Sequence, residues 1–216
     1  MGLLRALEMA LYRTFCAPTT SALLDRTREF QDRAQRRYDD TSLLMVEIVE
    51  WGYDSDRGKE LLARINRFHR TYDIANDDFL YVLSTFHLEP VRWIARFGWR
   101  SLTPNEVQAS YFFWREVGRR MNIRDIPPSH EEFERWSLDH ERTCFAYSDS
   151  NRRVARATRE LFVGWAPRPL RDAQRFIRPF HRARRGCLKR PLVKSHADYV
   201  ARKYLRLNDL RVCHPV

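Results

Sequence analysis

The sequence predicts a single all-α domain, a bundle of about eight or nine helices. Apolar residues recur with the period of a helix through almost every segment, and no useful run alternates as a strand would. Residues that start and stop helices flank these periodic segments, and no internal repeat is present. A chain of 216 residues that is 44% hydrophobic, with six Trp, can bury one sizeable core.

The first eighteen residues, "MGLLRALEMALYRTFCAP", predict an amphipathic helix of about fifteen residues. This helix is too short to span a bilayer, which needs ~20 apolar residues. Arg5, Glu8 and Arg13 interrupt its apolar run, and the small-residue cleavage site of a secretory signal is missing. Two interpretations stay open: the helix docks onto its own domain, or it lies on a membrane surface.

Thr20 or Ser21 opens a long predicted helix that Gly52 ends, with a break expected near residues 39–40. This helix is the longest periodic stretch in the first third of the chain. The sequence therefore predicts one long helix, interrupted once, between the N-terminal segment and residue 52.

The next two helices carry most of the unusual polar residues. Asp54 or Ser55 caps the first of them. Asn76 caps the second, and the acids at 77–78 suit the positive end of its dipole. Pro90 lies inside the apolar run of this second helix and is expected to kink or split it.

The remaining helices are marked by their starts. Thr103–Glu106 is a capping box with Pro at the first helical position, and Ser129–Glu132 is a second capping box. Further helices are predicted over 150–167, 168–186 and 195–210.

The chain is strongly basic, with a formal charge of +11. The excess basic residues either form an ordinary solvated surface or bind an anionic partner. That partner could be a membrane, a nucleic acid or the carboxylates of a bound cofactor. The densest basic run, 182–190, reads as a linker or as a patch for phosphates or lipid headgroups. No recognition helix or aromatic platform supports nucleic-acid binding, so no nucleic acid is expected. Four separated cysteines without a CxxC pair indicate thiols in a reducing, intracellular compartment.

His69 shares the apolar stripe of its predicted helix with Leu62, Ile65 and Tyr72. Taken alone, this pattern fits a core histidine better than an axial ligand of haem iron. His87, beside the expected kink, faces a pocket or fills a gap.

Other polar residues allow fewer roles. His130 and His140 lie ten residues apart on one helix, about 15 Å of rise, so they cannot share a metal. Glu89 and Arg92 flank Pro90 in an apolar helix, and we expect them to form ion pairs with each other or with Arg96 or Arg100.

The stretch "RINRFHRTYDIANDDFLYVLSTFHLEPVRWIARFGWRSLTPNE" resembles the central motif of the MpaB/rubber oxygenase catalytic domain family, in particular its fungal members. "RRYDDT" upstream, "IPPS" downstream and "YSDSNRRVARAT" further on are also similar to that family. The resemblance spreads over most of residues 18–185 as several short motifs.

The resemblance implies an all-α fold that holds haem b and uses O2 to cleave a carbon–carbon double bond of an isoprenoid chain. It implies that His69 is the axial iron ligand. It also implies that Arg37 and Thr41, four residues apart on an upstream helix, belong to the haem pocket. Asp40 stands where some latex-clearing proteins carry a Lys, so distal ligation by Lys is not expected.

Two arginines are expected to serve the cofactor. Arg92 and Arg100 are candidate partners of the haem propionates, because buried carboxylates favour Arg, or else they are structural. Aromatic residues at 111–114, with Phe79, Tyr81 and Phe86, line an apolar substrate channel or belong to the core.

The predicted organisation is an amphipathic segment at 1–17, a catalytic domain at 18–185 and a basic tail with a final helix at 186–216. Fungal members of the family usually carry a membrane-spanning helix, and here the short amphipathic segment stands instead. We therefore expect an intracellular enzyme, peripheral on the endoplasmic reticulum membrane. The alternative is a non-catalytic helical module that binds anionic membrane surfaces.

Overall fold

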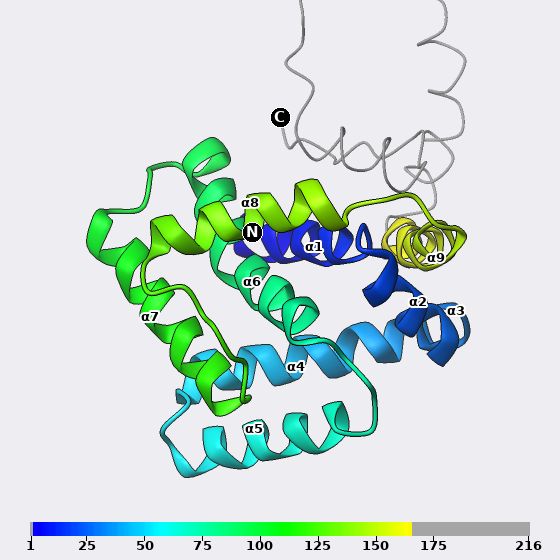
Figure 1. The fold of residues 1–216 in the computed structure, drawn as a ribbon, viewed down its shortest axis with the longest axis horizontal. Helices are drawn as coiled ribbons and strands as arrows, with labels where there is room; N and C mark the ends of the chain where they lie inside the picture. Colours follow the sequence, from blue (N-terminus) through cyan, green and yellow to red (C-terminus); the bar gives the residue numbers. More distant parts are fainter. Residues whose placement is uncertain (1, 166–216) are drawn as a thin grey trace, which may run out of the picture.

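The computed structural model describes residues 2–165, and every regular element in this part of the chain is a helix (Figure 1). This confirms the predicted all-α class. The helices are α1 (Gly2–Thr14), α2 (Pro18–Thr27), α3 (Glu29–Asp32), α4 (Ala34–Trp51), α5 (Asp56–His69), α6 (Asn76–Phe97), α7 (Pro104–Arg120), α8 (His130–Cys144) and α9 (Asp149–Trp165). The helices predicted over 168–186 and 195–210, the basic run 182–190 and the tail 186–216 lie outside the described residues.

The long helix expected before Gly52 is three helices, and its break was predicted at the wrong place. Pro18 occupies the first turn of α2, which ends where Arg28 adopts a left-handed conformation at φ 58°. Arg33, at φ −141° and ψ 44°, separates the short α3 from α4. Residues 39–40 lie inside α4 and continue it without a break. Neither break carries a Gly or Pro, the residues that usually mark one in a sequence.

Side-chain caps fix the starts of three helices, as the sequence predicts. The Ser55 hydroxyl accepts a 2.9 Å hydrogen bond from the backbone N–H of Gly58 at the start of α5. Thr103 and Glu106 form both halves of the capping box of α7. At the start of α8, Ser129 accepts a 3.2 Å bond from the backbone N–H of Glu132, which is one half of the capping box predicted there.

The predicted Asn76 cap is wrong. The N-cap of α6 is Ala75, which makes no side-chain bond, and Asn76 is the first helical residue. The Asn76 amide instead holds the backbone of Arg124, donating to its carbonyl at 3.2 Å and accepting from its N–H at 2.9 Å. Helix α6 continues through Pro90 to Phe97, so Pro90 does not split it.

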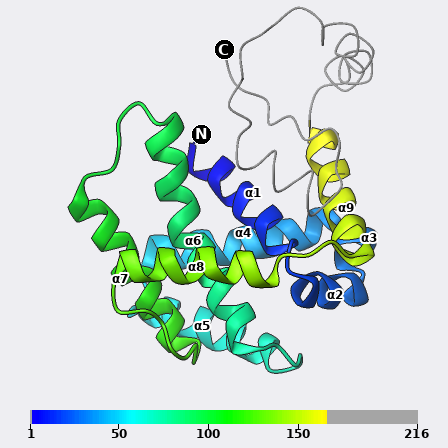
Figure 2. The same cartoon turned by 45° about the horizontal axis from the view of Figure 1, so that its top comes forward.

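Helix α1 is part of the core, which decides between the two interpretations of the N-terminal segment. It packs along α6 (Figure 2). Ala6, Ala10 and Tyr12 of α1 are buried, as is Phe15 directly after the helix. The apolar face of α1 is therefore covered by the protein itself and is closed to a membrane surface. Among the described helices, none has the length and apolarity needed to cross a bilayer.

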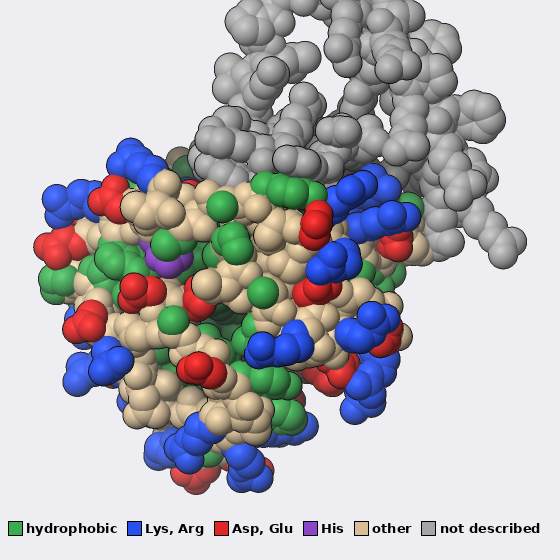
Figure 3. Space-filling view, turned by 45° about the vertical axis from the view of Figure 1, so that its right-hand side comes forward, with side chains coloured by type: hydrophobic (Ala, Val, Ile, Leu, Met, Phe, Trp, Pro, Cys, Tyr) green, Lys and Arg blue, Asp and Glu red, His purple; other side chains and the backbone are tan. Residues whose placement is uncertain are grey.

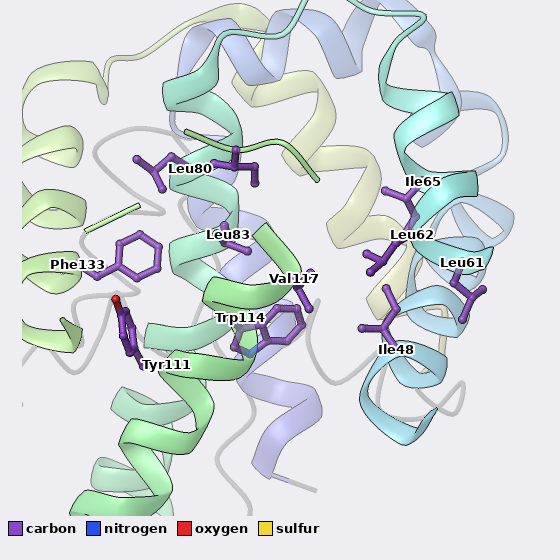
Figure 4. Packing of buried hydrophobic residues seen from close by; sticks show 11 residues of the cluster. Ile48, Leu61, Leu62, Ile65, Leu80, Leu83, Tyr111, Trp114, Val117 and Phe133 are labelled. Carbon is purple, nitrogen blue, oxygen red and sulfur yellow. The ribbon is translucent and has the colours of Figure 1, made fainter. Parts of the chain in front are cut away.

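Apart from the core around α1, a cluster of buried apolar residues joins α4, α5, α6, α7 and α8. In Figure 4, Leu62 and Ile65 point from α5 toward α7, where Trp114 and Val117 meet them. Tyr111 lies on the other side of α7 beside Phe133 of α8, so much of the aromatic set expected to line a channel is core.

The expected ion pair beside Pro90 is present and belongs to a larger buried network. Arg92 donates to Glu89 at 2.8 Å, as predicted. The sequence did not reveal Arg13 of α1, which is 3% exposed and lies 3.1 Å from the same Glu89 carboxylate. Arg13 also donates to Glu141 of α8, which accepts a 3.1 Å bond from Tyr81. Helices α1, α6 and α8 therefore share one network of buried charges.

The basic surplus is not gathered into one continuous patch on the face that Figure 3 shows, where acidic and basic side chains alternate over the surface. Many exposed arginines pair with a carboxylate one turn away, as Arg28 does with Asp32 at 2.9 Å.

Candidate functional site

His69 is the last residue of α5 and is half-buried. Leu62 and Ile65, on the same stripe, are buried as predicted. The third residue expected on the stripe, Tyr72, lies beyond the end of α5 and is 42% exposed. The imidazole lies edge-on to the ring of Phe79 on α6, with 5.0 Å between ring centroids. Its Nδ1 atom is buried and has no hydrogen-bond partner. A buried polar atom without a partner is costly in free energy, which marks this nitrogen as one that a ligand would complete.

Arg37 and Thr41 lie one turn apart on α4, and both are half-buried. Arg37 Nη1 donates to Thr41 Oγ1, while the Thr41 hydroxyl donates to the backbone carbonyl of Arg37 at 3.1 Å. The guanidinium also lies over the ring of Phe30, 5.4 Å from its centroid. Because the Thr41 hydroxyl gives its proton to the backbone, its lone pair is free to hold the guanidinium in place.

The structure brings His69 and Arg37 into one neighbourhood, where α4 and α5 pack against each other. Burial lowers the pKa of His69, and the positive charge of Arg37 lowers it further. Burial also lowers the pKa of Arg37. No ion pair of Arg37 is found within the described residues, and Asp40 pairs with Arg36 instead. The site therefore combines a neutral imidazole with a cation that has no bound carboxylate.

Arg92 lies elsewhere on α6. It donates to Glu89 at 2.8 Å and to Glu134 of α8 at 3.1 Å, so two carboxylates occupy its guanidinium. It stands thirteen residues after Phe79, the contact of His69, which is about 20 Å along a helix.

Arg100 follows the end of α6 and is exposed, with both terminal nitrogens on Glu106 at 2.7 and 2.6 Å. The structure therefore brings Arg37, Thr41 and His69 together, and it pairs Arg92 and Arg100 with carboxylates away from them.

His87 fills a buried gap. Its Nε2 lies 2.8 Å from Nδ1 of His130, and its Nδ1 lies 3.0 Å from the hydroxyl of Ser110. Burial, with the charges of His130 and Arg92, lowers the pKa of His87 to about 4. Sequence reasoning missed this pair, because the two histidines are 43 residues apart and nothing local signals their contact.

His140 stacks between Tyr81 and Trp136, at 4.8 and 5.1 Å between ring centroids. It therefore shares no site with His130, as the spacing predicts. Residues 2–165 contain no group of three His, Cys, Asp or Glu side chains that could hold a metal ion.

The motif "YSDSNRRVARAT" stabilises the start of α9. Asn151 is fully buried and donates to the carbonyls of Ala146 at 2.7 Å and Cys16 at 3.4 Å. Its carbonyl oxygen accepts from Ser21 and Ser148. These bonds tie α9 to the turn between α1 and α2, which gives the motif a structural role that sequence reasoning did not assign.

The family model and the most similar curated proteins point to the same family. The family model for the ER-bound oxygenase mpaB/B′ and rubber oxygenase catalytic domain matches residues 1–197. The chain is similar to the ER-bound oxygenases mpaB and mpaB′ of Penicillium brevicompactum, each 34% identical over 166 residues. These matches cover 68% of this chain and 42% and 39% of the relatives. The ER-bound oxygenase mpaB of Penicillium roqueforti is 34% identical over 169 residues, 70% of this chain and 57% of the relative.

The matched part thus spans between about two fifths and three fifths of the curated relatives. No solved structure matches the chain. The family model covers most of the chain, and the relatives are 34% identical over more than two thirds of it, so the chain belongs to the ER-bound oxygenase mpaB/B′ and rubber oxygenase catalytic domain family.

Proposed function

We propose that this chain is a haem-dependent oxygenase that uses O2 to cleave or oxidise a carbon–carbon double bond of an apolar, isoprenoid-type substrate. Its membership of an oxygenase family supports the reaction class. The observation that carries the cofactor assignment concerns the His69 imidazole. Its Nδ1 atom is buried without a hydrogen-bond partner, and the nearby Arg37 forms no ion pair within the described residues.

The residues at this place fit haem b, with the His69 imidazole as the group that would hold its iron. An imidazole ligates iron in its neutral form, and both burial and the Arg37 charge favour that form of His69. The Phe79 ring restricts the rotation of the imidazole. When bound, haem would supply the iron that binds and activates O2.

Arg37 and Thr41 would act beside the His69 imidazole. The Arg37 guanidinium can stabilise negative charge on a nearby oxygen, and its partial burial strengthens that interaction. Thr41 positions the guanidinium through the hydrogen bond between them. Arg92 and Arg100, which already bind carboxylates, would have the structural role that the sequence also allowed.

Apolar side chains around His69 suit an apolar substrate. Phe68 is 59% exposed and Tyr72 is 42% exposed, and both are neighbours of His69 in sequence. The Tyr72 hydroxyl lies close enough to Arg37 to influence its pKa. Exposed aromatic rings beside His69 would hold an alkene there and exclude water.

We also propose that the protein is intracellular and attaches peripherally to the endoplasmic reticulum membrane. The support is the name of the relatives, which are ER-bound oxygenases.

The absorption spectrum of the purified full chain after reconstitution with haem tests the proposal. We expect a Soret band in the wild type that is lost in His69→Gln, because Gln removes the imidazole ligand. The matched control is His140→Gln, which removes another imidazole that has a buried nitrogen without a hydrogen-bond partner and should keep the band. Circular dichroism checks that each variant is folded.

A folded wild-type protein that stays colourless would overturn haem dependence, and an unchanged band in His69→Gln would overturn the ligand. Arg37→Gln should keep the Soret band and lower the rate of alkene oxidation by about 100-fold, as loss of a charge-stabilising donor does in other enzymes.

A further inference from the structure

The turn after α6 carries the most exposed large apolar side chain in the described part of the molecule. Trp99 is 92% exposed, and Phe97, at the end of α6, is 42% exposed. Indole rings are usually covered, because they bring a large apolar surface to any contact. A Trp that is almost fully exposed beside a partly exposed Phe therefore indicates a surface that contacts a partner outside the chain.

This turn is held at both ends. The N–H of Gly98 donates to the carbonyl of Ile94 at 2.8 Å. A Cβ on Gly98 would lie 2.5 Å from that oxygen and 2.9 Å from the carbonyl oxygen of Arg100, so only glycine fits. On the other side, Arg100 is fixed by its two bonds to Glu106. The backbone thus presents Trp99 outward on a fixed turn.

Arginines flank both aromatic rings. The guanidinium of Arg96 lies 5.1 Å from the Phe97 centroid, and that of Arg100 lies 5.4 Å from the Trp99 centroid. Glu106 is neutralised by Arg100, whereas Arg96 forms no ion pair within residues 2–165. The surface is therefore apolar at its centre and positive at its rim. Trp at headgroup depth with Arg beside it is the composition of side chains at a membrane–water interface.

The position of this surface in the fold suits contact with an extended plane. The end of α6 projects from the bundle, and α1 begins at the same end of the molecule (Figures 1 and 2). A flat phospholipid surface could therefore reach the end of α6 without first meeting another helix of residues 2–165.

We propose that residues 96–100, the aromatic tip, are where this protein contacts a phospholipid surface. Trp99 enters the headgroup region, and Arg96 binds lipid phosphates. The inference rests on the membrane association proposed above, needs no haem, and differs from attachment through α1, whose apolar face is buried.

Co-sedimentation of the full chain with phosphatidylcholine vesicles, with and without phosphatidylserine, tests the tip. Trp99→Ser should weaken binding about tenfold on both vesicle types, because it removes one large apolar contact. The matched control is Trp51→Ser, since Trp51 is 50% exposed and has Arg57 5.4 Å from its ring centroid, but it ends α4, away from α6 (Figure 1). Binding by a basic segment alone would instead require phosphatidylserine and disappear at high salt.

Fluorescence gives a second readout. Brominated lipids should quench Trp emission in the wild type and in Trp51→Ser, and much less in Trp99→Ser. Equal binding and quenching in Trp99→Ser would overturn the tip while leaving membrane association in place. A wild-type chain that binds neither type of vesicle would overturn both the aromatic tip and the membrane association. The Soret band of the same samples would still test the oxygenase proposal separately.

Discussion

At the scale of single residues, His69 shows how a sequence pattern and its surroundings can favour different roles. Its spacing with Leu62 and Ile65 predicts a core histidine, and those two leucine and isoleucine side chains are buried as that pattern requires. His69 itself is only half-buried, with Nδ1 unpaired and the Arg37 charge near enough to lower its pKa. These surroundings support the proposal that His69 is a ligand.

His87 has the opposite character, since it is completely buried and both its nitrogens have partners. Its pKa falls to about 4 in the folded protein, while an unfolded histidine titrates near 6.5. Between these values the unfolded chain binds the proton and the folded chain does not. The free energy of unfolding is therefore highest above pH 6.5 and should fall by up to about 3 kcal/mol as the pH drops to 4.

Urea unfolding at several pH values measures this loss. In His87→Gln, which keeps a polar side chain in the gap, the fall between pH 6.5 and 4 should be smaller than in the wild type. Identical pH dependence in the two proteins would show that His87 does not carry it.

At the scale of elements, the corner between α4 and α5 depends on two glycines. Gly52 ends α4 with φ 74°, which an L side chain rarely adopts. Gly58, in the first turn of α5, faces the backbone of Gly52, and a Cβ there would lie 1.9 Å from the Gly52 carbonyl oxygen. The chain can therefore turn this tightly, and bring Arg37 near His69, only with glycine at both positions.

Gly58→Ala tests that corner. Alanine favours a helix over glycine by about 1 kcal/mol, but the clash with backbone should reverse the sign and cost about 2–3 kcal/mol of unfolding free energy. Gly164→Ala in α9 is the control, because its Cβ would meet nothing within 4 Å. Thermal and urea unfolding should show that this control is at least as stable as the wild type. A Gly58→Ala protein as stable as the control would contradict the requirement for glycine at this corner.

At the scale of the whole molecule, buried charges join helices that are distant in sequence. Arg13 lies in α1, Glu89 in α6 and Glu141 in α8, and all three are less than 10% exposed. Two buried carboxylates need the guanidinium between them, since an unpaired buried charge is strongly unfavourable. Helix α1 is thus part of the fold, and removing residues 1–17 would expose the core as well as delete a surface helix.

Replacing Arg13 by Leu should lower the free energy of unfolding by about 3–5 kcal/mol, because Glu89 and Glu141 would remain buried without their shared cation. The comparison is Arg5→Leu, an arginine of the same helix whose side chain is 53% exposed and whose loss should change stability by less than about 0.5 kcal/mol. Chemical denaturation of both variants measures the difference. Equal stability of the two variants would show that the network does not hold α1 in place.

The sequence by itself determined the helical class, three capped helix starts and the Glu89–Arg92 pair, because each depends on residues within one or two turns of each other. It also supplied Arg37, Thr41 and His69, through the resemblance of their motifs to a family. It could not give the breaks at Arg28 and Arg33, where the chain turns without Gly or Pro. The carboxylate partners of Arg13 and the contact of His87 with His130 were also hidden, since these residues lie 43 or more positions away.

Only the tertiary structure decided that α1 packs into the core, that the Arg37 charge lies near His69, and that Glu134 of α8 joins Glu89 on the Arg92 guanidinium. The physical reason is the distance along the sequence over which each interaction acts. Caps and helix periods are local free-energy preferences that a short segment carries alone, whereas a pKa, a buried ion pair or an exposed Trp is set by which distant helices pack beside it.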